Sequence, residues 1–220
     1  MGGMSTAELT ETDRTKLRRH AERGTFDRAA ANAILDEAYL AHVGFVVDGA
    51  PKVLPMTYGR IDDVLYLHGA AGNAMLKAAF GTEVCVTVTL LDGLVLARSA
   101  FHHSMNFRSV VLLGVAEQVE DPAEKQRALA AVVDHVVPGR GAESRPTSES
   151  EARKTAVLRL VIDEGSVKVR TGDAIDEPDD VALPHWAGVV PLRLTPGEPI
   201  ANADLAPALA APPTPGLFVR

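Results

Sequence analysis

The stretch LYLHGAAGNAMLKAAFG, residues 65–81, sets a histidine, small residues, an asparagine and a lysine where a strand pattern gives way to a helix pattern. Backbone N–H groups at such a turn bind phosphate when glycine lets the ligand approach closely. Gly69 permits that approach, Asn73 caps the helix or contacts the ligand, and Lys77 leans back toward the anion. His68 contacts the ligand or holds the loop through the backbone.

The same residues also fit a tight strand-to-helix connection with its lysine in solvent. Their spacing matches neither of two glycine-rich phosphate-binding patterns, GxxxxGK[ST] and GxGxxG. On spacing alone, the tight connection is favoured over the phosphate site.

A second polar segment, LARSAFHHSMNFRS (96–109), lies between two apolar runs. Donor-rich side chains at strand ends suit a rim that binds an anionic, planar ligand. A solvated loop whose arginines pair with carboxylates is an equal alternative. The side chains that bear on binding are those of Arg98, Ser99, His102, His103, Asn106 and Arg108.

Motifs for metal binding and nucleophilic catalysis are missing from the sequence. His102 and His103 are adjacent, so in a strand they point to opposite faces and cannot ligate one metal ion together. The only cysteine, Cys85, lies in an alternating apolar run typical of a buried thiol. The only tryptophan, Trp186, is expected at the edge of the core, with cover for a ring-shaped ligand as the alternative.

Composition describes a soluble globular chain of 220 residues with 46% hydrophobic residues and a formal net charge of −7. This charge argues against nucleic acid and anionic membrane as main partners. The polar N-terminus lacks the apolar core of a signal peptide, and the longest apolar run is too short to span a bilayer. We therefore expect a cytoplasmic protein.

Strand patterns dominate the elements that must position these residues. Asp48-Gly49 predicts a tight hairpin between strands over 41–49 and 50–61, and Asp92-Gly93 predicts another. Asp121-Pro122 predicts a helix start, and a last long strand is expected to bend near Gly165. The fold class is therefore mainly β: an antiparallel barrel or sandwich with inserted helices.

Three parts of the chain are expected. Residues 1–23 form a polar N-terminal arm, residues 24–194 form the folded domain, and residues 195–220 form a Pro/Ala-rich tail. Seven of the 14 prolines lie in the final 30 residues, which favours extended structure there.

Three longer stretches resemble one known family: HVGFVVDGAPKVLPMTYGRIDDVLYLHGAAGNAMLKA, VCVTVTLLDGLVLARSAFHHSMNFRSVVLLGVAEQVED and KVRTG…LPHWAGVVPLRL. They look like flavin-nucleotide-binding proteins related to pyridoxamine 5′-phosphate oxidase, in the branch with nitroimidazole-resistance-type proteins. The resemblance covers about residues 24–194. It implies a split β-barrel of Greek-key antiparallel strands, and a homodimer that binds FMN in a cleft at the subunit interface.

The resemblance also implies roles for particular residues. The segment LPMTYG is expected along the isoalloxazine ring, the strand-loop-helix after YLHG at the phosphate and ribityl chain, and SMNFRSVV along the cleft. The implied cofactor-binding residues are Met56, Thr57, Tyr58, His68, Gly69, Asn73, Lys77, Ser99, Asn106 and Arg108. The loop AAGNAM carries no basic residue before Lys77, so backbone N–H groups and Arg98 or Arg108 are expected to help hold the phosphate.

The leading hypothesis is an FMN-dependent oxidoreductase that acts on a small organic molecule, with a nitro compound or quinone as acceptor and a nicotinamide cofactor or another donor as reductant. The arginine-and-histidine pattern that grips the vitamer in the true oxidase is not recognisable, which disfavours pyridoxamine phosphate as substrate. One alternative is a non-catalytic protein that binds flavin or haem, with His68, His102 or His103 as axial ligand. Another is a structural protein that has kept the barrel and lost the cofactor.

Overall fold

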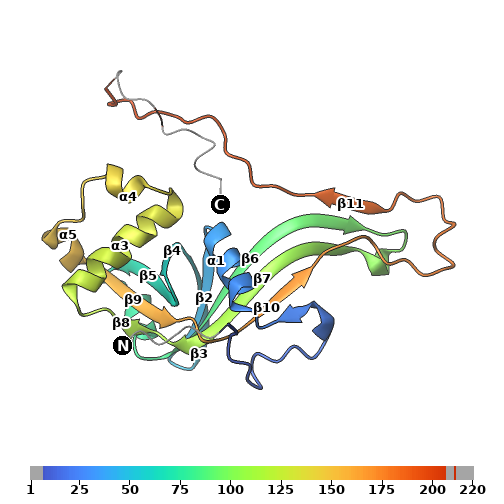
Figure 1. The fold of residues 1–220 in the computed structure, drawn as a ribbon, viewed down its shortest axis with the longest axis horizontal. Helices are drawn as coiled ribbons and strands as arrows, with labels where there is room; N and C mark the ends of the chain where they lie inside the picture. Colours follow the sequence, from blue (N-terminus) through green and yellow to red (C-terminus); the bar gives the residue numbers. More distant parts are fainter. Residues whose placement is uncertain (1–6, 207–210, 212–220) are drawn as a thin grey trace.

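The computed structural model describes residues 7–206 and residue 211 of the chain (Figure 1). Two antiparallel sheets form the fold, as the mainly β prediction requires. The seven-stranded sheet has the order β1-β10-β7-β6-β2-β3, with β11 also paired to β6, and the four-stranded sheet has the order β4-β5-β9-β8.

The larger sheet contains β1 (Gly24–Thr25), β2 (Ala41–Val47), β3 (Ala50–Met56), β6 (Glu83–Leu96), β7 (Ser104–Val115), β10 (Glu164–Arg170) and β11 (Gly188–Pro191). The smaller sheet contains β4 (Tyr58–Ile61), β5 (Val64–Ala70), β8 (Glu117–Gln118) and β9 (Thr155–Val161). The helices are η1 (Ala21–Arg23), α1 (Arg28–Glu37), α2 (Ala74–Ala79), η2 (Ala100–His102), α3 (Pro122–Val136), α4 (Arg140–Glu143) and α5 (Glu149–Lys154).

Local sequence signals account for several boundaries. Asp48 and Gly49 both have positive φ, 51° and 76°, which gives the tight turn predicted between β2 and β3. Asp121 accepts hydrogen bonds from the backbone N–H groups of Ala123 and Glu124, and Pro122 follows as the first helical residue. The predicted start of α3 is therefore confirmed together with its physical cause.

Three expectations about strands are wrong. The pattern over 50–61 divides at Thr57 into β3 and β4, which belong to different sheets. The last long strand likewise divides at residues 162–163 into β9 and β10, one in each sheet. Asp92-Gly93 forms no hairpin, because β6 continues through it with a β-bulge between Leu91 and Gly93.

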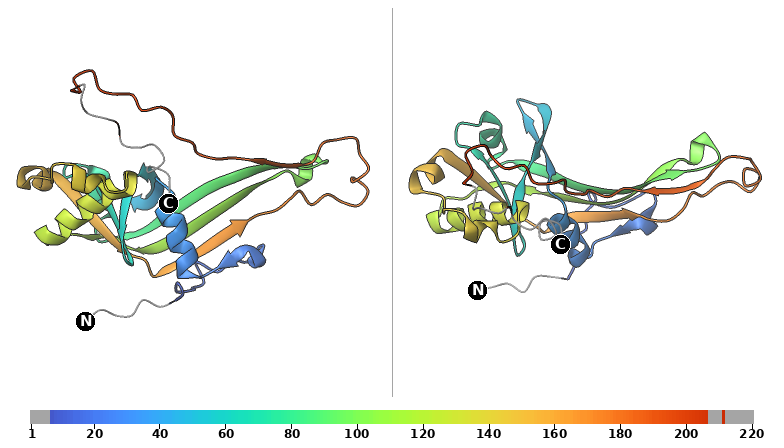
Figure 2. Two further views of the ribbon diagram at one scale, coloured as in Figure 1. Left: turned by 45° about the horizontal axis from the view of Figure 1, so that its top comes forward. Right: turned by 90° about the horizontal axis from the view of Figure 1, so that it is seen from above.

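The distal parts of β6 and β7 extend beyond the rest of the molecule as a long projection (Figures 1 and 2). We call this projection the arm: residues 88–109, β11 and the connection 171–187. Helices α3, α4 and α5 lie with the smaller sheet at the opposite end of the molecule. A strand rises about 3.3 Å per residue, so the 14 residues of β6 span roughly 45 Å.

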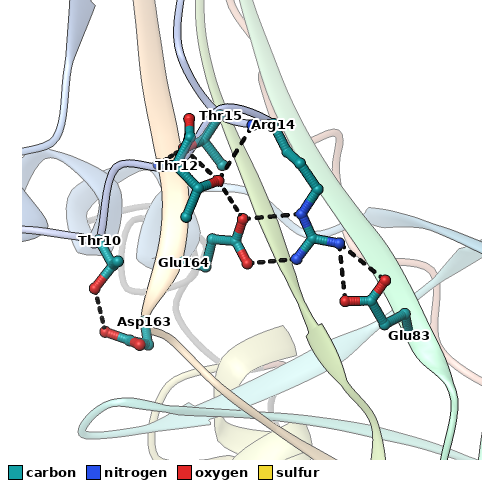
Figure 3. A network of polar contacts seen from close by, with 7 residues as sticks. All are labelled: Thr10, Thr12, Arg14, Thr15, Glu83, Asp163 and Glu164. Atoms are coloured by element: carbon teal, nitrogen blue, oxygen red, sulfur yellow. Dashed lines mark hydrogen bonds and ion pairs between the residues drawn. The ribbon is translucent and has the colours of Figure 1, made fainter.

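The N-terminal segment is fastened to the larger sheet. Leu9 is 3% exposed within the main core cluster. The Arg14 guanidinium bridges two strands, because it donates to Glu83 on β6 at 2.8 Å and to Glu164 on β10 at 2.6 Å (Figure 3). Leu9 and Arg14 thus fasten the N-terminal segment, residues 7–23, to the domain.

Among the described residues, no helix has the length and apolar character needed to cross a membrane.

Candidate cofactor site

The loop between β5 and α2 contains a buried nitrogen atom without a partner. His68, on β5, is half-buried, and its Nδ1 atom has no hydrogen-bond partner. Burial lowers the pKa of His68 below its usual value of 6.5, so the imidazole is neutral at pH 7. A buried polar atom without a partner is costly, and a bound ligand is one way to satisfy it.

Gly69 has a packing role of its own. A Cβ atom at this position would lie 2.5 Å from the Leu76 Cδ1 atom of α2. Glycine therefore leaves room for the Leu76 side chain at the end of β5, whether or not a ligand approaches the loop. At Gly69 the packing favours the interpretation as a tight strand-to-helix connection. A ligand-binding role is left to the neighbouring residues of the loop.

Two lysines carry positive charge near the loop. Lys77, on α2, is exposed and forms no ion pair within the described part of the chain. Lys154, at the end of α5, accepts a hydrogen bond at its backbone oxygen from Ala71 N–H at 2.8 Å. Sequence reasoning missed Lys154, because 83 residues separate it from Ala71 and only the pairing of β5 with β9 brings them together.

The residues expected along the ring lie at the corner between the two sheets. Met56 ends β3 and pairs with Ala41, and the half-buried Thr57 follows it. Tyr58 is 0% exposed, and its hydroxyl donates to the backbone oxygens of Leu35 and Ala38 at 2.6 and 3.1 Å. The side chain of Tyr58 therefore belongs to the core and does not face a cofactor.

The remaining predicted site residues lie on the arm, and their polar atoms are largely in use. Asn106 is 8% exposed, accepts a hydrogen bond from Arg170, and donates to the Gly172 backbone oxygen at 3.0 Å. Ser99 precedes η2, and its Oγ atom is buried without a partner. The signal for Arg170 was available in the sequence as the KVRTG segment, but its burial was not.

Both arginines expected to help with phosphate are paired with carboxylates. Arg98 donates from Nη1 to Asp176 at 2.7 Å. Arg108 donates to Glu37 and to Asp92, the latter at 2.8 Å, and these hydrogen bonds raise its pKa. The solvated-loop alternative, in which arginines pair with the chain's own carboxylates, thus describes these two residues.

Asn73 and the loop lie at the body of the molecule, whereas Ser99 and Asn106 lie on the arm. Roughly 12 residues of extended chain separate Ser99 from Thr87, where β6 leaves β2, which corresponds to about 40 Å. The structure therefore divides the predicted site residues into two groups within one chain.

A groove lies between these two groups. Its volume is about 820 Å³, and it is lined by residues 37–42, 89–92 and 191–194 together with Arg108. This volume is within the range of small-molecule and cofactor sites, about 300–1,000 Å³. The sequence analysis gave no ligand-binding role to residues 37–40, His42 or 191–194, which join the groove only through the fold.

Trp186 departs from its expected place at the edge of the core. Its side chain lies in the arm and the residue is 67% exposed. Phe101, also in the arm, is 90% exposed.

Comparison with known families assigns the chain. The sequence model of the protein family described as pyridoxamine 5′-phosphate oxidase matches residues 27–169. The chain belongs to this family. Among solved structures, the flavocytochrome Anf3 from Azotobacter vinelandii is 41% identical to this chain, with a TM-score of 0.86. That match covers 92% of this chain and 95% of Anf3.

Two further solved structures are similar to this family member. The FAD and haem binding protein from Mycobacterium smegmatis is 37% identical, with a TM-score of 0.84 and coverage of 89% and 97% of the two chains. The third structure is a protein from Bacteroides thetaiotaomicron that has been proposed to confer 5-nitroimidazole antibiotic resistance. It is 26% identical, with a TM-score of 0.57 and coverage of 66% of this chain and 86% of that chain. No curated protein matches the sequence.

Proposed function

We propose that this protein is a flavin-binding oxidoreductase whose flavin nucleotide lies between the corner of β3 and β4 and the loop that joins β5 to α2. The observation that carries the proposal is the half-buried His68, whose Nδ1 atom has no partner in the chain. The relatives described as a flavocytochrome and as an FAD and haem binding protein support a flavin as the ligand. The nucleotide is either FAD, which the description of one relative names, or FMN, which the sequence resemblance implies.

Each part of the proposed site has a physical role. Neutral His68 offers one hydrogen bond to the flavin, and Met56 and Thr57 form an apolar and hydroxyl-bearing surface for its ring. Lys77 and Lys154 supply the positive charge that phosphate oxygens require, and Asn73 supplies an amide. The flavin, when bound, supplies the electron chemistry for a small organic substrate, so the chain needs no acid or base of its own.

We also propose a homodimer, in which a second copy covers one face of the arm. Leu94 lies directly opposite Met105 on β7 and Val190 on β11. These three side chains are exposed by 40, 51 and 42%, and they form an apolar stripe across three neighbouring strands. Burying such a stripe is favourable, and sheet surfaces of this kind associate with a matching copy.

Haem is a second proposed cofactor. Two relatives at 41 and 37% identity over most of their length carry haem or a flavocytochrome description. Haem held by a histidine exchanges single electrons, which complements a flavin that exchanges one or two. This second cofactor makes electron transfer within one protein the proposed activity.

The test is reconstitution of the purified full chain. Ligand-free protein is titrated with FMN, FAD and haemin in separate experiments, and binding is followed by flavin fluorescence and by the haem Soret band. We expect tight binding of FAD or FMN and a flavin-dependent reduction of haemin by a nicotinamide donor. A folded protein that binds neither flavin would overturn the proposed function.

A further inference from the structure

We propose that the groove lined by residues 37–42, 89–92 and 191–194 is the haem site, with His42 as an axial ligand and Arg193 as the counter-charge to the propionates. This inference rests on the proposed haem binding and assigns it a place in the fold. The sequence analysis gave neither His42 nor Arg193 a ligand-binding role.

The groove exists because two strands share one edge of β6. Strand β2 pairs with this edge only from Cys85 to Thr87, and β11 pairs with it only from Gly93 to Leu96. Between them, no strand in the described part of the chain covers the edge, and the β-bulge at Leu91 and Gly93 turns it. Bulges of this kind often lie beside active sites, where they redirect side chains.

The walls of the groove suit a large, flat and mostly apolar ligand. Leucines project from both sides, from β6 and from the segment after β11, and Tyr39 adds an aromatic ring. The leucines are Leu40, Leu90, Leu91, Leu192 and Leu194. An apolar, water-poor surround with a few polar groups is what cofactor sites present, and it also tunes the potential of a haem iron.

Of the seven histidines in the chain, His42 suits the role of axial ligand best. His42 lines this groove, and His135 lines a smaller one. His135 is bonded through Nε2 to the Ala38 backbone oxygen at 2.8 Å. His42 has no hydrogen bond or ion pair with any described residue, so both of its ring nitrogens are available to a metal.

The other histidines are less suited. His103 is bonded through Nδ1 to the Ser99 oxygen at 2.9 Å, and His102 lies 3.4 Å from Glu177, both on the exposed arm. His68 belongs to the loop proposed for the flavin.

The groove leaves one cation for a carboxylate of the ligand. Arg108 is paired with both Glu37 and Asp92, so this cluster has a formal net charge of −1 and offers no free cation. Arg193 is exposed and pairs with no carboxylate of the described chain. It therefore remains the cation that a propionate would meet.

The experiment measures haemin binding to the full-length protein already loaded with its flavin. Wild type, His42→Ala and His185→Ala are titrated with haemin, and the Soret band and the electron paramagnetic resonance spectrum are recorded. His185 is the matched control, because it is exposed, its side chain forms no hydrogen bond or ion pair with a described residue, and it lies outside the groove.

We expect His42→Ala to weaken haemin binding by more than the roughly 10- to 100-fold that loss of an outer-shell partner costs, because it removes a direct ligand. The wild-type spectrum should return when imidazole is added to His42→Gly. Arg193→Glu should weaken binding with an unchanged spectrum, and His185→Ala should match wild type. Flavin affinity and the urea midpoint should be the same in all variants, which shows that the fold is intact.

The outcomes separate the two proposals. Wild-type protein that binds flavin but no haemin overturns the haem half of the proposed function. Wild-type protein that binds haemin while His42→Ala keeps the same affinity and spectrum overturns the groove assignment alone. Loss of binding in His68→Ala, His102→Ala or His103→Ala, with His42→Ala unaffected, has the same meaning and moves the site elsewhere.

Discussion

The arm and the β5–α2 loop differ in how their basic side chains are paired. The arm carries Arg98 and Arg108, and Arg170 lies beside it at the end of β10, yet each guanidinium is bonded to carboxylates or backbone oxygens of the same chain. The loop carries little charge, yet it has a buried nitrogen without a partner on His68 and an unpaired Lys77. A segment rich in arginines can therefore use them to stabilise the fold as readily as to bind a ligand.

The difference has a physical origin in burial. Arg170 is 5% exposed and pairs with no carboxylate among the described residues, so its charge is met by Asn106 and by the backbone oxygens of Gly172 and Asp173. Burial lowers its pKa from the usual value, although the guanidinium stays charged. These contacts hold the start of the connection 171–187, so the arm depends on Arg170 for its shape.

The largest expected effect is at Arg170. We predict that Arg170→Ala lowers the free energy of unfolding by about 3 kcal/mol, because it removes charged hydrogen bonds and leaves buried acceptors without a donor. Urea denaturation of ligand-free protein measures it. Lys168→Ala, on the same strand, is the control. A stable Arg170→Ala variant with weaker flavin binding would reverse the comparison and make the arm the binding region.

The next effect concerns flavin affinity. We predict that Lys77→Ala weakens FAD or FMN binding about tenfold, because a charge-assisted hydrogen bond to phosphate contributes about 1.5 kcal/mol or more. Arg108→Ala should change the affinity by less than about threefold, since its charge is already matched. Lys16→Ala, an exposed lysine of the N-terminal segment, serves as control in the fluorescence titration. Equal losses at Lys77 and Arg108 would show that both regions bind the nucleotide.

A smaller effect is expected in the pH dependence of stability. The unfolded chain protonates His68 near pH 6.5, whereas the folded chain does so only at lower pH. Stability should therefore fall as the pH drops below about 6.5 toward the folded-state pKa, with a contribution of at most about 1.4 kcal/mol per pH unit.

Urea midpoints of wild type and His68→Gln between pH 5 and pH 8 measure this contribution. The variant should lack the part of the slope that His68 supplies. Identical slopes in the two proteins would show that the imidazole is as well solvated in the folded chain as in the unfolded one.

A further effect separates core from site at the corner between the sheets. Tyr58→Phe should cost about 1–2 kcal/mol of stability, because the backbone oxygens of Leu35 and Ala38 lose a donor. Flavin affinity should stay unchanged, because the hydroxyl points into the core. Chemical denaturation and the same fluorescence titration test both halves, and a selective loss of flavin binding would return Tyr58 to the site.

Local chemistry explains which elements were predictable. The turn at Asp48-Gly49 and the start of α3 at Asp121 depend on residues within four positions of each other, and both were predicted. The break at Thr57 and the bulge at Leu91 depend on how two sheets meet, which no short window contains. Candidate residues were recognised by type, but their pairing with Glu37, Asp92 or Asp176 is a property of the fold.

The same limit applies to Trp186 and Lys154. A lone tryptophan usually packs in a core, and only the length of the arm explains why this one does not. Lys154 acquires its position from the pairing of β5 with β9 across more than 80 residues. Long-range pairing therefore decides which side chains meet, while the sequence pattern decides which elements exist.

The exposure of Trp186 has an optical consequence. As the only tryptophan of the chain, it is the only source of indole fluorescence, and it lies on the arm away from the loop proposed for the flavin. Its emission maximum reports directly whether that part of the arm is in water or covered. Dilution of the protein should therefore shift the emission to longer wavelength if a second copy covers the arm, which turns one residue into a gauge of association without any added label.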